Sequence, residues 1–403
     1  AAGNVSYKAT VLDIPATVSG GSGLQLRLAD VIGDATISGI EILRANSPVP
    51  AGTPTYQLDF QQSPGGAWVR QAGAGLSETG YAGSGEFTWT AGAATAGNSA
   101  RHRWRTPHGA SGTSADPFLI AGDGKNYFIN DSGLTGDEFT TAAGDDFNSG
   151  KSPDQPMASL AALLEAYNLD PDDVIYLDTG NYAVWRDINW TASDSGARLQ
   201  GPLNGGIAQL DRGNTSTATV VLRIDGADDV SVTRVRLTGA ETGVRVLNDA
   251  DGFRLTFTQI SGNRNGGIQV EASGSDNAYI ADNTLFGIPG GTVNDNQNFG
   301  IFVSNSNNTS VLRNRLYDGT ANGIESGGGS AYNVTVSGNT ISNFSGHGIG
   351  FYTTGTVSGN TIYDNGYHGI ELSGTGTRVV SGNTIYRHLY SAGYGIYGSA
   401  DAV

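Results

Sequence analysis

The chain has 403 residues, with 61 glycines, one methionine and no cysteine, and its formal net charge is -16 at pH 7. The composition is therefore turn-rich rather than helical, disulfides and thiolate metal sites are excluded, and nucleic acid or an anionic membrane surface is disfavoured as the main partner. We expect no membrane-spanning helix, because the chain has no run of about 18 apolar residues.

Residues 1–121 are predicted to form an antiparallel β-sandwich, with a separate segment within 1–46 as an alternative division. Short alternating runs, separated by Gly, Ser and Pro turns, fall at 24–28, 37–43, 56–60, 67–70, 86–90, 101–105 and 117–120. Trp68, Trp89 and Trp104 are expected in the core. The domain resembles bacterial immunoglobulin-like modules of surface proteins at Gly66–Trp68, Phe87–Trp89, Arg101–Arg105 and Ala115–Ile120.

A second domain is predicted over residues 122–403, and it begins with an acidic, glycine-rich stretch at 131–150. We expect this stretch to be a surface loop. Its candidate metal ligands are Asp137, Glu138, Asp145 and Asp146. Calcium prefers carboxylate oxygens, so Ca²⁺ is the candidate ion, although the spacing matches no recognised calcium cage. No other cofactor is expected.

One amphipathic helix is predicted at about 158–168. Leu160, Leu163, Leu164 and Tyr167 follow the i, i+3, i+4, i+7 pattern and share one face. A helix placed just before a stack of short strands can cover the open end of their apolar core, which would otherwise expose unpaired backbone.

A Gly followed by Ile or Val recurs in the last 176 residues, from 228 to 403, at Gly243, Gly267, Gly300, Gly323, Gly348, Gly369 and Gly395. The steps range from 21 residues (348 to 369) to 33 residues (267 to 300), and the longest is predicted to hold a loop at 286–298. A second phrase, Ser-Gly-Asn-Thr-Ile, occurs at 337–341, 358–362 and 381–385. Such a period predicts one coil of a solenoid rather than a helical repeat or a propeller blade.

Each coil must stack on its neighbours, because its strands of two to four residues are too short to be stable alone. At about 4.8 Å per coil, parallel hydrogen bonds form on both sides, and Ile324, Ile349 and Ile370 are expected to line one interior. Asparagines at the corners are expected to adopt left-handed backbone angles and to hydrogen-bond one another. The polar stretch at 201–217 is predicted to be a loop before the regular stack.

This repeat resembles the right-handed parallel β-helix of the pectate-lyase-like superfamily, in its carbohydrate-binding and sugar-hydrolase repeat form. Residues 146–153, 156–160 and 172–182 resemble the usual start of such helices, so the resemblance covers about 127–403. It implies an all-β chain: an N-terminal antiparallel sandwich, then a right-handed parallel β-helix with one capping helix. It also implies a secreted or cell-surface location and a polysaccharide or cell-surface glycan as partner. The fold serves lyases, epimerases, tailspikes and adhesins, so it does not define activity.

The residue after each Gly-Ile or Gly-Val pair faces outward if the Ile or Val faces inward. This outward row predicts that Glu325 and Glu371 lie two coils apart, about 9 to 10 Å, near the upper limit for the carboxylates of an inverting glycosidase. His347 and His368 precede equivalent glycines and are expected to stack, as a metal site, a base or a half-exposed corner ladder. No residue is assigned as catalytic, and these four are candidates.

A row of aromatic residues is predicted beside the second phrase, at Phe286, Tyr317, Tyr363 and Tyr386, with Ser342 between the middle two. The rings are candidates for stacking on sugars, or they pack on each other and shield the sheet.

The motifs of the family's enzymes are largely missing. The epimerase signature Tyr-Gly-x-Asp-Pro-His is absent. No lysine, which could serve as the base of a lyase, follows Asp228. Gly346-His347-Gly348 resembles only the Gly-His-Gly motif among the motifs of the polygalacturonases. The leading hypothesis is therefore an extracellular structural or adhesive segment of a larger bacterial surface protein. A polysaccharide lyase or hydrolase and a noncatalytic carbohydrate-binding module are the alternatives. Because no second capping element is evident, we expect a longer chain or end-to-end stacking with another subunit at the C-terminal coil.

Overall fold

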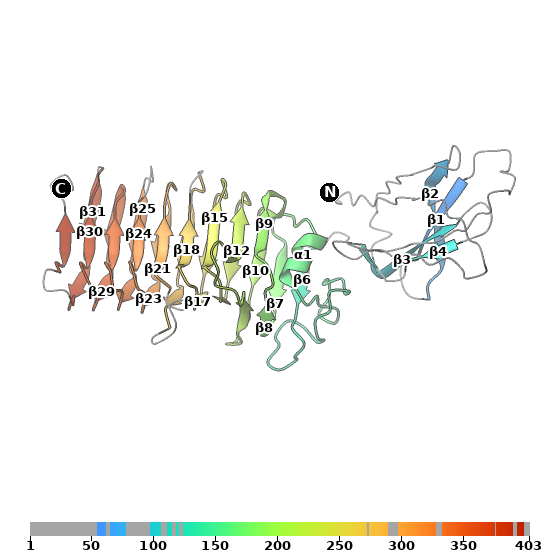
Figure 1. Cartoon of the computed structure of the whole chain (residues 1–403), viewed down its shortest axis with the longest axis horizontal. Helices are drawn as coiled ribbons and strands as arrows, with labels where there is room; N and C mark the ends of the chain where they lie inside the picture. The colour runs from blue at the N-terminus through green and yellow to red at the C-terminus, as the bar shows by residue number, and fades with distance from the viewer. Residues whose placement is uncertain are drawn as a thin grey trace, which may run out of the picture. The chain divides into compact units, whose positions relative to one another are not determined.

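The main feature of the fold is a stack of coils in which three parallel sheets run side by side (Figure 1). The computed structural model describes residues 55–61, 65–77, 97–105, 111–114, 118–120, 124–271, 274–288, 297–327, 333–374, 376–389 and 393–398. The chain divides into two compact units. One comprises residues 1–123 and 147–149, and the other comprises residues 124–146 and 150–403.

The first unit contains one antiparallel sheet in order β2-β1-β3-β4, with β5 paired to β3. Its strands are β1 (Thr55–Gln61), β2 (Trp68–Ser77), β3 (Gly97–Arg105), β4 (Ser111–Thr113) and β5 (Phe118–Ile120). The strands predicted at 24–28, 37–43 and 86–90, and Trp89, lie outside the described residues, and β4 was not predicted. The antiparallel sheet is confirmed, whereas the immunoglobulin-like assignment stays a prediction.

Within this unit, the Arg103 guanidinium lies over the Trp68 ring, 4.4 Å from the ring centre. Arg103 also pairs with the buried carboxylate of Asp59 at 2.7 Å. The Arg103 guanidinium neutralises the buried Asp59 carboxylate, whose charge would be costly to bury alone, and the Trp68 ring covers the guanidinium.

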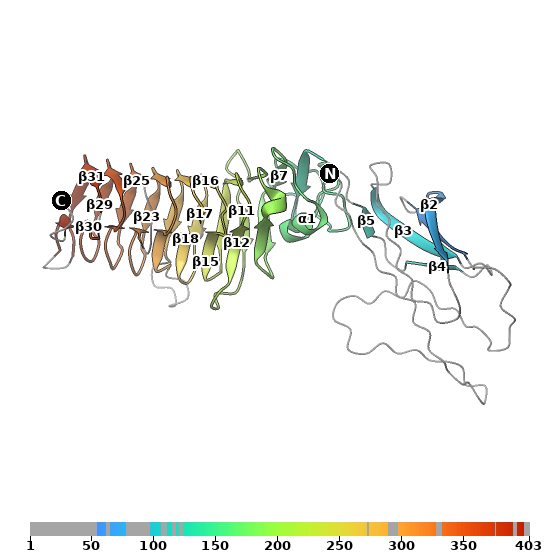
Figure 2. The same ribbon diagram turned by 90° about the horizontal axis from the view of Figure 1, so that it is seen from above.

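The first sheet of the coils has ten strands, which pair in parallel (Figure 2). They are β6 (Asn126–Ile129), β7 (Val174–Leu177), β10 (Arg198–Gln200), β13 (Ser231–Thr233), β16 (Arg254–Thr256), β19 (Tyr279–Ala281), β22 (Ser310–Leu312), β25 (Val334–Ser337), β28 (Gly355–Ser358) and β31 (Arg378–Ser381). The central residues of β10, β13 and β16 point inward, since Leu199, Val232 and Leu255 are in register and fully buried.

The second sheet has nine strands, each of which follows a first-sheet strand along the chain. They are β8 (Gly180–Ala183), β11 (Ala208–Asp211), β14 (Val235–Thr238), β17 (Gln259–Ser261), β20 (Thr284–Phe286), β23 (Arg315–Tyr317), β26 (Thr340–Ser342), β29 (Thr361–Tyr363) and β32 (Thr384–Tyr386). The prediction of a loop over 201–217 is therefore wrong for residues 208–211. This strand lacks the repeat phrases, and its apolar residues Ala208 and Leu210 pair with β8 and β14.

The third sheet also has nine strands, and the last seven are formed by the Gly-Ile and Gly-Val phrases. They are β9 (Ile188–Thr191), β12 (Val220–Asp225), β15 (Thr242–Leu247), β18 (Gly266–Val270), β21 (Phe299–Val303), β24 (Ile324–Ser326), β27 (Ile349–Phe351), β30 (Ile370–Leu372) and β33 (Ile396–Gly398). Ile324, Ile349 and Ile370 are in register and fully buried, so the predicted shared interior is confirmed. The loop predicted at 286–298 lies mostly outside the described residues.

The two repeated phrases are the two sides of one packing contact. A Cβ added to Gly348 would lie 2.3 Å from the Ile362 side chain, and one added to Gly323 would lie 2.5 Å from that of Ile341. Because the isoleucine of the second phrase approaches the third-sheet backbone this closely, only glycine fits there. Because each such glycine must lie beside one such isoleucine, the two phrases recur together along the sequence.

Buried asparagines form a hydrogen-bonded ladder at the corner between the first and second sheets. The Asn314 amide donates to Asn339 Oδ1 at 3.1 Å, and the Asn339 amide donates to Asn360 Oδ1 at 2.9 Å. The left-handed residue is the one before each asparagine, such as Gly338 at φ 68° and Arg313 at φ 52°. Other asparagines between the strands, such as Asn308, Asn333 and Asn343, have the expected left-handed angles, but the ladder asparagines do not. The preceding residue makes the turn, which leaves the asparagine side chain directed inward.

One α-helix occurs within the described residues, α1 (Leu160–Ala166), and it is shorter than the predicted span of 158–168. It lies at the N-terminal end of the coils and contacts β9, and a short 3₁₀ turn, η2 (Ala192–Asp194), follows that strand. Leu160 and Leu163 are buried, and Ser159 caps the helix by accepting from the Ala162 N–H. No helix in the described part of the chain is long and apolar enough to cross a membrane.

We expect Asn339→Ala to lower the free energy of unfolding by about 2 kcal/mol or more. The change removes the acceptor of the Asn314 backbone and side-chain N–H groups and frees the Val311 carbonyl, and each buried group left unpaired costs about 1–3 kcal/mol. Urea unfolding followed by circular dichroism measures the change. The matched control Asn189→Ala alters an exposed strand position and should cost less than about 0.5 kcal/mol. Equal losses for the two variants would contradict the role of the ladder.

Candidate functional site

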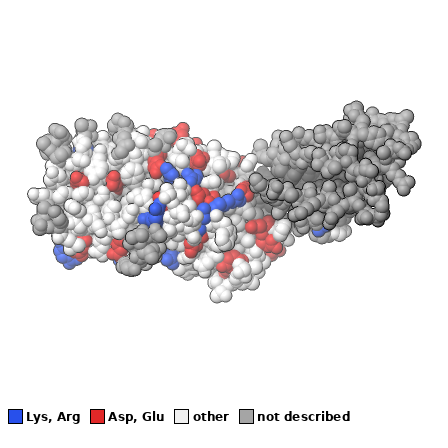
Figure 3. All heavy atoms as spheres, viewed as in Figure 1, with Lys and Arg blue, Asp and Glu red and all other residues white. Residues whose placement is uncertain are grey.

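The outward residues of the third sheet lie in one row, in the register that the sequence predicted. Residue pairs along this row are Arg245 with Gln269, Gln269 with Phe302, Phe302 with Glu325, Glu325 with Gly350, Gly350 with Glu371, and Glu371 with Tyr397. Its N-terminal part is occupied by ion pairs such as Arg245 with Glu271. In the view of Figure 3, charged side chains gather over the N-terminal coils, and the C-terminal coils carry few.

The carboxylate of Glu371 is the centre of a hydrogen-bonded cluster on this row. His347 Nε2 lies 2.8 Å from Glu371 Oε2, and the Tyr352 hydroxyl donates to the same oxygen at 2.7 Å. The His347 and Glu371 side chains are 17% and 23% exposed, so the contact is partly shielded from water yet open to a ligand. The structure therefore joins two of the four predicted candidates directly.

Asn322 connects the other carboxylate to the same cluster. Its amide donates to Glu325 Oε2 at 2.8 Å, and its carbonyl oxygen accepts from the His347 backbone N–H at 2.8 Å. The sequence analysis did not single out Asn322. A signal was present, because Asn322 directly precedes Gly323 as His347 precedes Gly348, which places both in one column of the repeat.

Tyr352, the other residue that the sequence analysis missed, fills the position between the two carboxylates. A Cβ on Gly350 would lie 2.7 Å from the Tyr352 hydroxyl oxygen, so the ring folds back over the glycine that separates Glu325 and Glu371 in the row. An outward glycine that leaves room for a neighbouring aromatic ring is a recognised device in sheets. Burial raises the pKa of Tyr352, and the hydrogen bond to Glu371 adds to this, so the phenol remains a donor.

The two histidines stack on adjacent coils, as predicted, with ring centres 5.0 Å apart and planes at 22°. His347 Nδ1 accepts from the His368 N–H at 3.3 Å, which leaves the proton on Nε2 to point at Glu371. His368 Nδ1 accepts from the Tyr394 N–H at 3.0 Å, and the ring stacks on Tyr397 at 4.6 Å. Three of the four ring nitrogens are thus engaged. Within the described residues, no group of three or more His, Asp or Glu side chains is arranged to hold a metal ion.

The acidic residues predicted as calcium ligands take part in hydrogen bonds with the surrounding chain. Asp137 accepts from the Asn130 amide at 2.8 Å, and burial raises its pKa. Glu138 accepts from the backbone N–H groups of residues 203 and 204, and Asp146 accepts from those of residues 158 and 159. The Asp145 N–H donates to the Pro156 carbonyl. Calcium binding by these four residues stays a prediction.

The aromatic row on the second sheet consists of two stacked pairs. Phe286 with Tyr317, and Tyr363 with Tyr386, each have ring centres 5.2 Å apart and planes at 5°. Ser342 lies between the pairs in register. Stacking within a pair uses one face of each ring. Sugar binding by these four residues stays a prediction.

A family comparison agrees with the coil geometry. Residues 220–386 match the family model described as a right handed beta helix region. This part of the chain is a right-handed β-helix. No curated protein matches the chain.

Several solved structures are similar in fold to the chain. The alginate lyase from Paenibacillus sp. str. FPU-7 is 18% identical, with a TM-score of 0.40, over 60% of this chain and 95% of that one. Pectate lyase Pel9A is 14% identical, with a TM-score of 0.44, over 69% and 78%. PfbA, a surface adhesin of Streptococcus pneumoniae, is 11% identical, with a TM-score of 0.32, over 55% and 85%. At these identities the likeness concerns the fold alone.

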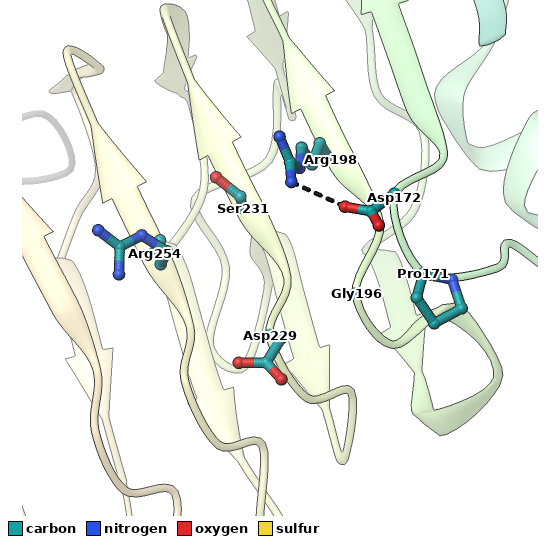
Figure 4. A pocket seen from close by; sticks show the side chains of 7 residues that line it. All are labelled: Pro171, Asp172, Gly196, Arg198, Asp229, Ser231 and Arg254. Atoms are coloured by element: carbon teal, nitrogen blue, oxygen red, sulfur yellow. Dashed lines mark hydrogen bonds and ion pairs between the residues drawn. The ribbon is translucent and has the colours of Figure 1, made fainter. Parts of the chain in front are cut away.

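Two cavities lie on other faces of the β-helix and do not include the Glu371 cluster. The one in Figure 4 encloses about 470 Å³ along the first sheet, where Arg198, Ser231 and Arg254 lie in one row. Arg198 pairs with Asp172 at 2.8 Å, and the Arg254 guanidinium lies 4.3 Å from the ring centre of Tyr279, directed away from Ser231 (Figure 4). The two guanidinium groups therefore do not converge on one ligand.

We expect the imidazole of His347 to titrate below the ordinary value of 6.5, because burial lowers its pKa more than the charge of Glu371 raises it. Glu371→Gln removes the raising charge, so the pKa of His347 should fall further. Histidine NMR titration, with assignment by His347→Gln, measures both values. In the matched control Glu271→Gln, a carboxylate paired with Arg245 elsewhere on the helix is lost, and the pKa of His347 should not change.

The lowered pKa of His347 also determines how the stability of the folded chain depends on pH. Since the folded chain favours neutral His347, the unfolded chain binds the proton more readily, and stability should fall as the pH decreases from about 6.5 toward the folded pKa. A pKa of His347 above 6.5, or one that rises in Glu371→Gln, would contradict this account of the cluster.

Proposed function

We propose that this chain is a glycan-binding segment of an extracellular protein, in which the β-helix is a rigid scaffold and the C-terminal half of the third sheet is the binding surface. The observation that carries the proposal is the Glu371 carboxylate, held in place by His347 and Tyr352 on an outward sheet face. This proposal is consistent with the adhesive role that the sequence analysis favoured, and it adds a binding surface for that role.

The chemistry of the cluster suits the hydroxyl groups of a sugar. Glu325 and Glu371 offer carboxylate oxygens, the Asn322 amide keeps a second N–H, and the Tyr352 oxygen, whose proton is donated to Glu371, can accept, so donor and acceptor sites lie close together over three coils. Tyr367 and Tyr397 are 46% and 42% exposed and lie against His347 and His368. Exposed aromatic rings beside polar groups can contact the apolar face of a sugar while its hydroxyls are hydrogen-bonded.

The surface is also fixed before a ligand arrives. Parallel strand pairing holds the backbone of each coil, and the side chains of Glu371, His347 and Asn322 are each hydrogen-bonded to a neighbour. Binding then immobilises few protein side chains, so less entropy is lost on association. A linear polymer lying across the coils would meet equivalent positions at each step of about 4.8 Å.

The charge of the surface favours a neutral glycan. Glu325 and Glu371 are separated from each other only by Gly350 in the row, and no lysine occurs after residue 228. A polyanionic chain would be repelled by the two carboxylates and by the net charge of -16. We therefore place neutral polysaccharides ahead of uronate polymers.

Titration calorimetry with soluble neutral polysaccharides tests the proposal. Glu371→Gln should weaken binding by about tenfold or more, since a hydrogen bond to a charged group contributes about 1.5–3 kcal/mol. Tyr397→Ala should also weaken it, because the exposed ring that would contact the apolar face of the sugar is lost. Glu165→Gln is the matched control, because Glu165 is 62% exposed on α1 and its surface ion pair contributes little. Absence of binding by the folded wild-type chain, or equal binding by Glu371→Gln, would contradict this site and leave the structural role of the segment.

Hydrolysis is a second candidate function, favoured by the presence of two carboxylates in one row. Inverting glycosidases keep about 6.5–9.5 Å between their carboxyl groups to admit the sugar and a water molecule. Here the Tyr352 phenol lies over Gly350 on the coil between them and is bound to Glu371. That position is the one that substrate and water would need, so we expect binding without cleavage.

Incubation of the same polysaccharides with the chain, followed by an assay for reducing and unsaturated ends, distinguishes the two functions. We expect no products. Ends that appear with the wild-type chain and disappear in both Glu325→Gln and Glu371→Gln would establish a hydrolase or lyase in place of a binding segment. The Glu165→Gln variant controls for a contaminating enzyme.

A further inference from the structure

The second cavity of the β-helix lies on the second sheet, away from the Glu371 row. It encloses about 470 Å³ over the first three strands of that sheet. Asn181 on β8, Gln209 on β11 and Arg236 on β14 follow one another in register along its floor, and Asp131 and Thr179 line it as well. Its size is within the usual range of small-molecule sites.

Arg236 differs from every other arginine of the described coils. Eight of them form ion pairs: Arg186, Arg198, Arg212, Arg223, Arg245, Arg264, Arg313 and Arg387. Three lie over aromatic rings: Arg234, Arg254 and Arg315. Arg378 bonds to backbone carbonyls. Within the described part of the chain, Arg236 has none of these partners, and its Nε is buried without an acceptor.

An unpaired, half-buried guanidinium requires an explanation, because it stays protonated at any physiological pH and loses hydration on burial. Asp131 lines the same cavity, yet the two do not form an ion pair. The Asp131 carboxylate is held at its wall by the Gly133 and Asn181 N–H groups, at 2.6 and 3.0 Å. A Cβ on Gly180 would lie 2.6 Å from it, so the close approach depends on that glycine. The Asp131 carboxylate and the Arg236 guanidinium, which are opposite in charge, thus line one cavity without forming an ion pair.

We propose that this cavity is a second binding site, for one neutral sugar residue with adjacent hydroxyl groups. A hydroxyl both accepts and donates, so one of the pair can accept from Arg236 while its neighbour donates to Asp131. The Asn181 and Gln209 side-chain amides make no hydrogen bond within the described chain, and each supplies a donor and an acceptor between the two charges. The Thr179 hydroxyl is buried without a partner beside them.

The other linings of the cavity fit the same ligand. Ile207 is 49% exposed at its edge and offers an apolar surface for the C–H face of the ring. A simple anion fits less well, because the Asp131 carboxylate opposes it and the cavity holds one charge of each sign. The site is independent of the third-sheet surface, since Arg236 and Glu371 lie on different sheets of the β-helix.

Saturation-transfer NMR on the full chain, with galactose, mannose and glucose as separate probes, tests the proposal. At least one sugar should bind, and Arg236→Ala should weaken it by about tenfold or more, as expected for loss of a hydrogen bond to a charged donor. Gln209→Ala should weaken it less. Arg254→Ala is the matched control, since it removes one arginine from the adjacent coil of another sheet and should leave binding unchanged.

Circular dichroism and the thermal midpoint show whether each variant is folded, and Arg236→Gln provides a second test if Arg236→Ala is unstable. Binding that persists in Glu371→Gln assigns the signal to this cavity rather than to the third sheet. No signal for any of the three sugars would overturn the proposal. Equal binding by the folded Arg236 variants, or displacement of the sugar by acetate or inorganic phosphate, would also overturn it.

Discussion

The register between neighbouring coils is the constraint on which the rest of this structure depends. Parallel backbone pairing alone would allow one coil to slip against the next. The buried asparagines remove this freedom, because a slip would separate the Asn314, Asn339 and Asn360 amides from their partners in the interior. The close contact of Gly348 with Ile362 acts in the same direction, since only that pairing places a glycine opposite the isoleucine.

The candidate site is a consequence of this register rather than of any local motif. Glu325, Gly350 and Glu371 are far apart in sequence, but the coils place them in consecutive positions of one row. The glycine in the middle gives Tyr352 the space to reach Glu371. His347 obtains its tautomer from the backbone of the next coil through the His368 N–H. Glu371, His347 and Tyr352 therefore each owe their orientation to a residue of a neighbouring coil.

Much of this arrangement could be predicted from the sequence, because rows follow directly from a repeat. The shared interior at Ile324 and the stacking of His347 on His368 are of this kind. Side-chain direction cannot be obtained from a period, so Tyr352 was missed although its glycine was aligned. The strand at 208–211 was missed because the first coils carry neither phrase, and tertiary pairing rather than local pattern determines them.

The distribution of charge connects the scaffold with its proposed ligands. Most arginines of the coils neutralise a carboxylate on the same or an adjacent coil, for example Arg223 and Arg212 at Asp187. These ion pairs occupy surface positions, so few charged groups remain to bind a ligand. Among the described residues, Glu371, which pairs with no arginine, and Arg236, which pairs with no carboxylate, are exceptions on two different faces. Both faces offer donors and acceptors in balance, and a neutral polyhydroxylated molecule matches that balance better than an ion of either sign does.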